Sequence, residues 1–337
     1  MYNKIYVKIK NFFKNNYKFL IVLCTLIFLF YYEFPYIIYK SGGTINLDSR
    51  IIIDKKYKQD GTLSMSYVTA MKGTLPFILL SYVIPDWDLK SIDKVSNGSD
   101  YEETLEIGKT YLREGIDNAI IAAFNESDYD ITITKDIYKV IYLSESSNTD
   151  VKIGDEILSI NDKKVNNVEE IKEYINTLNE NDKVILNVRN NDKDYKRYAF
   201  IYKEKDDSLK LGLAFNTTYE YITEIPVEVK MKNNESGSSG GLMMSLAIYN
   251  ALTSDDITKG LNIVGTGSIN SDGTVEEIGG VKYKVLAAEK KHADIFFCPE
   301  KNYKEAVNVK KKRNLDVEIV KVSSLKDAIN YLNNKKI

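Results

Sequence analysis

An uncharged apolar run close to the N-terminus constrains this chain more than any other feature. Residues 19–32, FLIVLCTLIFLFYY, carry no charged side chain, and apolar character resumes after Glu33 as far as Tyr39. A helix rises about 1.5 Å per residue, so residues 19–39 would span a hydrocarbon layer about 30 Å thick. The tyrosines around Glu33 would form an aromatic belt at the far interface. The sequence therefore predicts a transmembrane signal anchor over residues 19–39.

The charge in front of this run predicts its orientation. Residues 1–18 form a basic tail without acids, and its lysines are Lys4, Lys8, Lys10, Lys14 and Lys18. Positive charge stays on the cytoplasmic side, which predicts a single-pass protein of the cell membrane with a cytoplasmic N-terminus and an extracytoplasmic remainder. A cleaved signal peptide is the alternative, but cleavage requires small residues after the apolar run. Because YYEFPY follows instead, an uncleaved anchor is favoured.

Composition excludes several classes of function. The 337 residues have a formal net charge of −2, which argues against a nucleic-acid partner, and 44% of them are hydrophobic, enough for the cores of two or three domains. Cys24 and Cys298 lie far apart, so no disulfide is expected between them. The single histidine, His292, is interpreted as a surface helix residue. With no HExxH motif and no His/Cys cluster, we expect neither a metal nor a cofactor.

The middle of the chain resembles a PDZ domain. It follows a β-rich and helical membrane-proximal region, residues 42–130, in which we find no chemistry. Residues 151–165 read VKIGDEILSINDKKV, with a turn at Gly154 before a buried strand, and a helix over residues 168–178 follows at a fitting distance. The resemblance, assigned to residues 131–205, implies a groove between a strand and this helix that captures an extended peptide by strand addition.

Two properties of this module stay open. The loop that binds a C-terminal carboxylate is expected near residues 140–144, but the sequence VIYLSES found there lacks a Gly-hydrophobic-Gly pattern. Recognition of free C-termini is therefore not settled by the sequence. A spacer module that only positions its neighbours is the alternative to a peptide-binding one.

Residues 206–337 alternate strands and helices. We predict strands at 209–215, 226–231, 261–269, 295–298 and 317–322, and helices at 239–252, 281–291, 303–311 and 324–333. The first helix follows the run SGSSGG (236–241), where Ser238 or Ser239 stands at the N-cap position. This pattern is typical of an ordinary capped helix after a flexible turn. It also suits a site where N–H groups at the positive end of a helix stabilise an oxyanion beside a reactive serine.

A reactive serine needs a base. The only histidine lies in EKKHADIFF, at a polar helix end, so a catalytic triad would depend on it alone. Lysine is the remaining candidate, because a buried lysine loses its preference for the charged form and can act as a general base.

Several linked motifs resemble the proteolytic domain of Lon-type peptidases. In chain order they are SGSSGG (236–241), GTG (265–267), DGTVEEIGGVKYKVLAA (272–288) and FFCPEKN (296–302). The succession of membrane anchor, PDZ module and Lon-type domain is similar to the membrane-anchored PDZ–Lon peptidase family (YlbL/SepM-like). The resemblance implies Ser239 as the nucleophile, Lys284 as the base and Thr266 as the residue that orients the lysine by a hydrogen bond.

The residues around these positions bear on the resemblance in both directions. Gly237 and Gly241 match the family pattern, and Lys284 is bracketed by apolar side chains on the predicted helix, as a lysine with a depressed pKa requires. Three positions depart from it: Ser236, Ser238 and Gly240 stand where many relatives have Asp, Pro and Ala. The last two changes predict a looser loop.

The sequence as a whole predicts an α+β protein with a Lon-type proteolytic domain over residues 206–337. We expect a membrane-anchored serine endopeptidase that cleaves extracytoplasmic peptides or exposed protein segments, with backbone N–H groups around Gly237, Ser238 and Ser239 holding the oxyanion. No G-x-x-x-x-G-K-[ST] motif occurs, so no ATPase motor is expected. The alternative is a non-catalytic membrane-anchored PDZ scaffold or adaptor with a degenerate Lon-like domain. The oligomeric state does not follow from the sequence.

Overall fold

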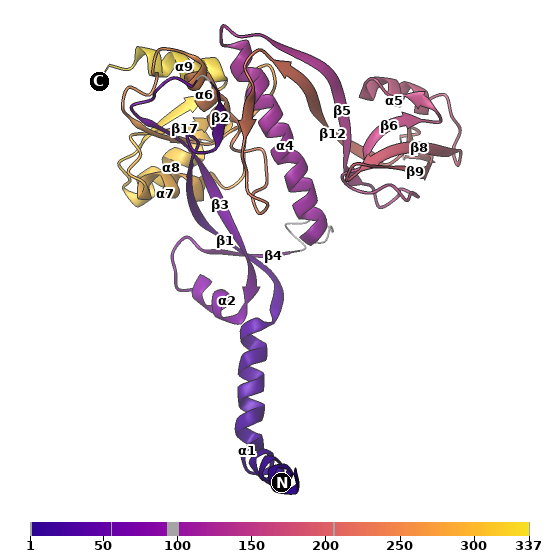
Figure 1. The fold of residues 1–337 in the computed structure, drawn as a ribbon, viewed down its shortest axis with the longest axis vertical. Helices are drawn as coiled ribbons and strands as arrows, with labels where there is room; N and C mark the ends of the chain where they lie inside the picture. The colour runs from indigo at the N-terminus through magenta and orange to yellow at the C-terminus, as the bar shows by residue number, and fades with distance from the viewer. Residues whose placement is uncertain (1, 55, 93–100, 205, 337) are drawn as a thin grey trace. The chain divides into compact units, whose positions relative to one another are not determined.

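The computed structural model describes residues 2–54, 56–92, 101–204 and 206–336, and its contacts group the chain into two units. The first unit contains Met1–Ser41 and Val68–Gly98, and the second contains Gly42–Tyr67 and Ser99–Ile337. Two long strands, β1 (Glu33–Asn46) and β3 (Thr62–Thr74), have residues in both units. The mixture of helices and strands confirms the predicted α+β class (Figure 1).

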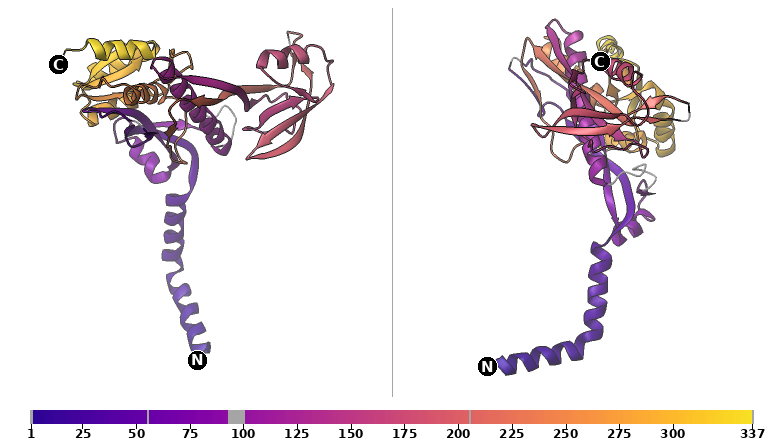
Figure 2. Two further views of the ribbon diagram at one scale, coloured as in Figure 1. Left: turned by 45° about the horizontal axis from the view of Figure 1, so that its top comes forward. Right: turned by 90° about the vertical axis from the view of Figure 1, so that its right-hand side faces the viewer.

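The first unit combines a long N-terminal helix with a short helix and paired strands. Its elements are α1 (Tyr2–Tyr31), α2 (Leu75–Ser81) and β4 (Asp88–Ser91), together with parts of β1 and β3. β1 pairs with β4 in antiparallel fashion, with Ile37 opposite Lys90. Figure 2 shows that α1 bends along its length. α1 is long and apolar enough to cross a membrane, a test that a signal sequence near the N-terminus would also pass.

The span predicted over residues 19–39 is not one continuous helix, because its C-terminal part is a strand. α1 begins at Tyr2 and ends at Tyr31, and β1 starts at Glu33. β1 buries the consecutive residues Ile37 and Ile38. A short apolar run of this kind does not distinguish a buried strand from a helix, because neither the period of two nor that of 3.6 is visible in it.

The C-terminal part of the chain is built around a parallel sheet in the second unit. Its strands lie in the order β18 (Glu318–Val322), β17 (Ile295–Pro299), β14 (Asn262–Gly265) and β3. Successive side chains of β17 point to opposite faces. Ile295 and Phe297 join the core beneath α6 (Gly241–Leu252) and α9 (Leu325–Asn334), whereas Phe296 and Cys298 pack with α7 (Val281–Lys290) and α8 (Tyr303–Arg313) (Figure 1).

The elements predicted from residue 281 onward agree with the structure to within two residues at each end. The predicted strand over residues 261–269 is instead divided into β14 and β15 (Ser268–Ile269), and Thr266 and Gly267 lie between them. Shorter elements complete this part: β13 (Val227–Val229) pairs with β2 (Ile51–Ile53), β16 (Val275–Glu276) pairs with β15, and a 3-10 helix covers Glu300–Asn302.

An antiparallel sheet forms the PDZ-like part of the second unit. Its strand order is β12 (Leu213–Thr223), β5 (Ile131–Leu143), β6 (Glu156–Ile160), β8 (Lys183–Asn190) and β9 (Lys193–Phe200), and β7 (Lys163–Lys164) pairs with β6. The short strands β10 (Tyr202–Lys203) and β11 (Leu209–Lys210) pair with each other. α5 (Val168–Ile175) contributes Ile171 and Ile175 to the core of this sheet.

One long helix supports the C-terminal part from the side. α4 (Tyr101–Asn125) packs against both β12 and α6. Its last turns bury Ala119, Ile120 and Phe124 in the same core as α6. The apolar spacing of residues 100–125 predicts this helix, and residue 100 lies outside the described residues. The helix therefore belongs to the core of the C-terminal part, although more than a hundred residues separate the two in sequence.

Candidate active site

Three side chains from distant parts of the chain meet beside the first turn of α6. Lys284 lies in the first turn of α7, Thr266 lies between β14 and β15, and Ser239 lies just before α6. Lys284 Nζ is 2.8 Å from Ser239 Oγ and 3.0 Å from Thr266 Oγ1. The structure thus brings together the residues to which the sequence resemblance gave the roles of nucleophile, base and orienting hydroxyl.

The hydrogen bonds of Thr266 show which groups of this cluster donate and which accept. The Thr266 hydroxyl donates to the backbone oxygen of Ser239, with 3.0 Å between Oγ1 and O. Because the hydroxyl proton of Thr266 is used in this bond, Oγ1 acts toward Lys284 as an acceptor and receives one of its N–H groups. A neutral amine that donates one N–H to Thr266 has its lone pair free for the hydroxyl proton of Ser239. The backbone oxygen of Ser239 also accepts the N–H of Gly267, at 2.8 Å, which fixes the serine backbone.

Burial shifts the lysine toward its neutral form. Lys284 is only 3% exposed, and desolvation lowers its pKa from 10.5 to about 7. Among the described residues, no carboxylate forms an ion pair with Lys284. Cys298 would raise the lysine pKa if it carried a negative charge, but burial raises the pKa of its thiol to about 12. The thiol is uncharged at neutral pH, so it does not hold the lysine in its charged form.

The loop that carries Ser239 is fixed by α4 and by β15. The N–H of Gly237 donates to the backbone oxygen of Gly108 at 2.8 Å, and the hydroxyls of Ser238 and Ser268 are 2.7 Å apart. A Cβ added at Gly115 would lie 3.0 Å from the Cα of Ser238. Close contact between α4 and the loop therefore requires glycine at this face of the helix.

The start of α6 differs from the prediction. Neither Ser238 nor Ser239 is the N-cap, because that position belongs to Gly240, which makes no side-chain cap. A Cβ at Gly240 would lie 2.4 Å from Met65 Sδ, and one at Gly241 would lie 2.8 Å from Ile269 Cγ2. The two glycines allow the helix to begin directly against neighbouring side chains. The loop is thus closely packed where the sequence predicted a looser one.

Backbone N–H groups are available beside the serine. The N–H of Gly237 is already donated to α4. Within the residues that the structure describes, the N–H groups of Ser238, Ser239 and Gly240 have no protein acceptor. They lie at the N-terminal end of α6, where the helix dipole is positive. These groups, and not that of Gly237, are the donors that an anionic oxygen could meet here.

The sequence missed the contribution of α4. The sequence gives residues 100–125 no role, yet Gly108 and Gly115 lie against the loop that carries Ser239. Their spacing of seven residues places them on one face of a helix, and this spacing is the signal that could have revealed the contact. The sequence also offered no sign of Met65, which comes from β3.

The PDZ-like part has a groove between α5 and β12. A cavity of about 670 Å³ is lined by Ile171 and Ile175 on the helix side and by residues 209–215 on the other side. The expected carboxylate-binding segment, residues 140–144, was placed wrongly: it contributes Tyr142 and Ser144 to the lining, but residues 140–143 belong to β5. On the other side of the groove, β11 is followed by Leu211 and Gly212, and Gly212 has a positive φ of 73°.

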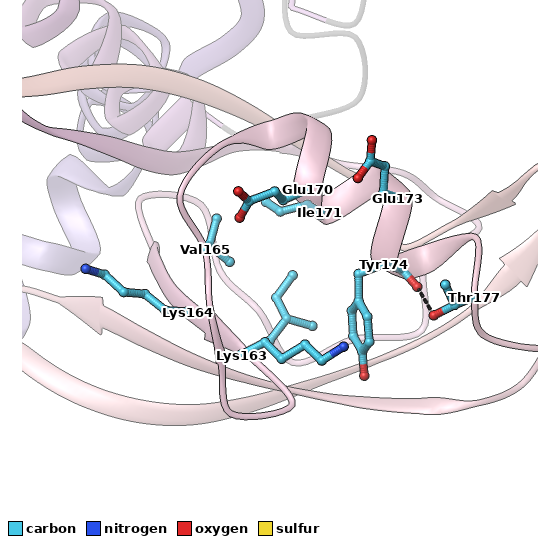
Figure 3. Close-up of a pocket in the computed structure, with 9 residues that line it drawn as sticks. Lys163, Lys164, Val165, Glu170, Ile171, Glu173, Tyr174 and Thr177 are labelled. Atoms are coloured by element: carbon cyan, nitrogen blue, oxygen red, sulfur yellow. Dashed lines mark hydrogen bonds between the residues drawn. The ribbon is translucent and has the colours of Figure 1, made fainter.

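A smaller cavity of about 300 Å³ lies between β7 and α5 (Figure 3). Lys163 lies 4.4 Å from the centre of the Tyr174 ring, and Lys164, Glu170 and Glu173 also line the cavity. Positive and negative side chains therefore surround it together, and it offers no single charge to a ligand. Ile171 lines both cavities.

His292, the single histidine, lies on the surface. His292 is exposed after the end of α7, with a positive φ of 51°. In the described parts of the chain, no group of three His, Cys, Asp or Glu side chains could hold a metal ion.

Comparison with known proteins identifies both parts. Residues 220–334 match the model of the Lon protease (S16) C-terminal proteolytic domain, and residues 120–196 match that of the PDZ domain. This chain carries a Lon-type proteolytic domain and a PDZ domain. The combination agrees with a PDZ–Lon peptidase family, as the sequence motifs predicted.

Curated relatives cover the Lon-type domain only. A Lon protease of Halothermothrix orenii is 31% identical over 131 residues, which are 38% of this chain and 16% of the relative. A Lon protease of Aster yellows witches'-broom phytoplasma is 30% identical over 98 residues, 29% of this chain and 12% of the relative. The chain thus spans about a sixth or less of the length of these relatives.

Among solved structures, the PDZ domain of an SdrC-like protein from Listeria monocytogenes is similar to 25% of this chain and 92% of its own, with 19% identity and a TM-score of 0.23. The PDZ domain is therefore identified by the family match over residues 120–196 and not by this structural similarity.

Proposed function

We propose that the chain is a membrane-anchored, ATP-independent serine endopeptidase that uses a Ser239–Lys284 dyad. One observation carries the proposal: a buried amine with a pKa of about 7 lies 2.8 Å from the hydroxyl oxygen of Ser239. A surface lysine would be charged at neutral pH and could not take a proton. The match of residues 220–334 to the Lon proteolytic domain supports the same assignment.

The reaction starts from neutral Lys284, whose lone pair can accept the hydroxyl proton of Ser239. Lys284 takes the hydroxyl proton of Ser239, and Oγ forms a bond with the carbonyl carbon of the substrate peptide. Thr266 keeps one N–H of the lysine engaged, so the lone pair stays directed to Ser239. When the C–N bond breaks, the Lys284 ammonium returns the proton to the leaving amine. Neutral Lys284 then activates a water molecule, which hydrolyses the acyl-enzyme and regenerates the serine.

The tetrahedral intermediate carries a negative oxygen. The N–H groups of Ser238, Ser239 and Gly240 are unpaired at the start of α6 and are the proposed donors to this oxygen. The helix dipole adds a favourable potential at the same end. The arrangement requires no cofactor, since the chain's own residues supply nucleophile, base and oxyanion donors.

Substrate supply follows from the PDZ domain and the membrane anchor. The groove between α5 and β12 would bind an extended segment and raise its concentration near the protease. The basic residues before the apolar run favour a cytoplasmic N-terminus, which would place the protease outside the cytoplasm. Without an unfolding motor, the substrates would be peptides or protein segments that are already extended.

The test uses the full chain in detergent and a fluorophosphonate probe for reactive serines. Wild-type protein should be labelled at Ser239 and should cleave a library of unstructured peptides. Ser239→Ala should lose both activities, and Lys284→Ala should lose labelling while keeping Ser239. Ser245→Ala is the matched control, because Ser245 is a buried serine of α6 whose hydroxyl donates to Leu242. Persistent cleavage by Ser239→Ala would exclude Ser239 as the nucleophile. A wild type that is neither labelled nor active would favour the non-catalytic scaffold.

A further inference from the structure

The apolar part of α1 is shorter than a bilayer. The uncharged residues 19–32 rise only about 20 Å as a helix, whereas the hydrocarbon layer is about 30 Å thick. The sequence reached the required length only by continuing the helix to Tyr39, but β1 begins at Glu33. Snorkelling of the Lys18 side chain recovers part of the difference on the cytoplasmic side. Additional apolar surface is needed at the other end.

The first unit has such a surface on α2 and the turn that follows it. None of the residues of α2, LPFILLS, is buried. Leu79 is 58% exposed, and Tyr82 and Val83 are each 78% exposed. Soluble proteins seldom leave so many neighbouring apolar side chains in water without a partner. We call residues 75–87 the α2 segment.

The α2 segment adjoins the end of α1 within the same unit. α2 contacts α1, and a Cβ at Gly73, just before α2, would touch both Tyr36 and Ile78. The exposed aromatic residues of α1 and β1 here are Tyr31, Tyr32 and Tyr36. The apolar surface of α1 therefore continues onto the α2 segment. In Figure 1 α2 lies next to the end of α1 where β1 begins.

The polar residues around this surface are those of a membrane interface. Trp87 packs against Phe77, with 6.4 Å between ring centres, and Lys40 lies 4.7 Å from the centre of the Trp87 ring. Lys90 lies 5.5 Å from the centre of the Tyr39 ring. Tryptophan and tyrosine gather at the level of the lipid headgroups, and lysine side chains near the end of a membrane helix extend their charge to the same level.

We propose that the α2 segment inserts into the extracytoplasmic leaflet beside α1 and forms a second, interfacial membrane contact. Leu79, Leu80 and Val83 enter the edge of the hydrocarbon, and Trp87 lies at the headgroup level. The contact compensates for the short apolar part of α1. The proposal rests on the membrane anchoring proposed above, and it assigns lipid, not a second copy of the chain, as the partner of this surface.

The chain contains a built-in probe, since Trp87 is its only tryptophan. The full chain is reconstituted into vesicles of three parts phosphatidylcholine to one part phosphatidylglycerol, with bromine atoms either near the glycerol end or near the methyl end of the acyl chains. Bromine near the glycerol end should quench Trp87 fluorescence about twofold, and bromine near the methyl end should quench it less. Leu79→Glu/Val83→Glu should relieve the quenching. Ile222→Glu, a change at an isoleucine of the second unit that is 68% exposed, should not.

Co-flotation of protein with vesicles separates the possible failures. A chain that floats but shows no bromine quenching is anchored by α1 with its α2 segment in water, which overturns this proposal alone. Fluorescence that is shielded from iodide but not quenched by bromine, and that becomes accessible when the protein is diluted in excess lipid, identifies a second copy as the partner and also overturns it. A chain that does not float with the vesicles refutes the anchoring itself and this proposal with it.

Discussion

The pH dependence of serine reactivity tests the chemistry of the dyad most directly. Only neutral Lys284 can take the proton of Ser239, and burial lowers the lysine pKa to about 7. A group with this pKa is neutral to about 1% at pH 5, 9% at pH 6, 50% at pH 7 and 91% at pH 8. The rate of fluorophosphonate labelling should therefore rise about tenfold per pH unit below pH 6 and level off above pH 8. The total increase from pH 5 to pH 8 is about 90-fold.

No other group near the lysine should distort this curve. The thiol of Cys298 has a pKa of about 12 and stays protonated throughout the range. Lys284 has no acidic ion-pair partner in the portion of the chain that is described, so no carboxylate titrates against it. A single titration is thus expected.

The assay is single-turnover labelling of the full chain in detergent, with circular dichroism at each pH to confirm that the fold persists. Lys284→Arg is the control, because a guanidinium stays charged and should give a low rate at every pH. A wild-type rate that continues to rise up to pH 10 would show that the lysine titrates like an exposed one. A rate independent of pH would show that Lys284 is not the base. Either result refutes the reasoning from burial.

Three further predictions concern stability and positioning. Lys284→Met should abolish labelling but raise the thermal midpoint. The lysine pKa is about 7 in the folded state and 10.5 as the ordinary value, so the wild type loses stability as the pH falls from 10.5 toward 7, by about 5 kcal/mol at most. The increase in thermal midpoint of the variant over the wild type should therefore be larger at pH 6 than at pH 10. Thr266→Val, which removes the acceptor of a lysine N–H, should slow labelling about tenfold or more without unfolding the protein. Gly115→Ala should displace Ser238 and lower kcat/KM about tenfold, whereas Lys109→Ala on the exposed side of the same helix should leave kcat/KM unchanged.

The sequence predicted the C-terminal elements well because their local patterns and their packing agree. The strand over residues 295–298 is uniformly apolar and buried on both faces, as a strand of a parallel sheet should be. The helix of Lys284 places Val281, Val285 and Ala288 in one core, and Lys284 itself is only 3% exposed. The resemblance in four linked motifs implied the roles of Ser239, Thr266 and Lys284, and the structure gives the distances between them.

Other features could not be read from the sequence because they depend on contacts between distant segments. α1 ends at Tyr31 because the next residues form β1, which pairs with β4, and no local sequence pattern indicates this pairing. The carboxylate-binding loop was expected near residues 140–144, but residues 140–143 belong to β5, and the strand beside the groove, β12, follows the helix in the chain. The predicted strand over residues 261–269 breaks at Thr266, whose N–H still donates to Phe297 of β17 and whose hydroxyl accepts an N–H of Lys284.

The loop of Ser239 is held in place by residues outside its own motif. The run SGSSGG contains the proposed nucleophile but no residue that fixes it in place. Gly108 of α4 accepts the N–H of Gly237, Met65 of β3 fills the space over Gly240, and Thr266 holds the serine carbonyl. Burying an amine costs about 5 kcal/mol relative to an ordinary lysine, so a loosely held loop would relax and let water reach Lys284. The supports from α4 and β3 therefore serve the chemistry as well as the fold, because they keep the lysine dry and the hydroxyl within its reach.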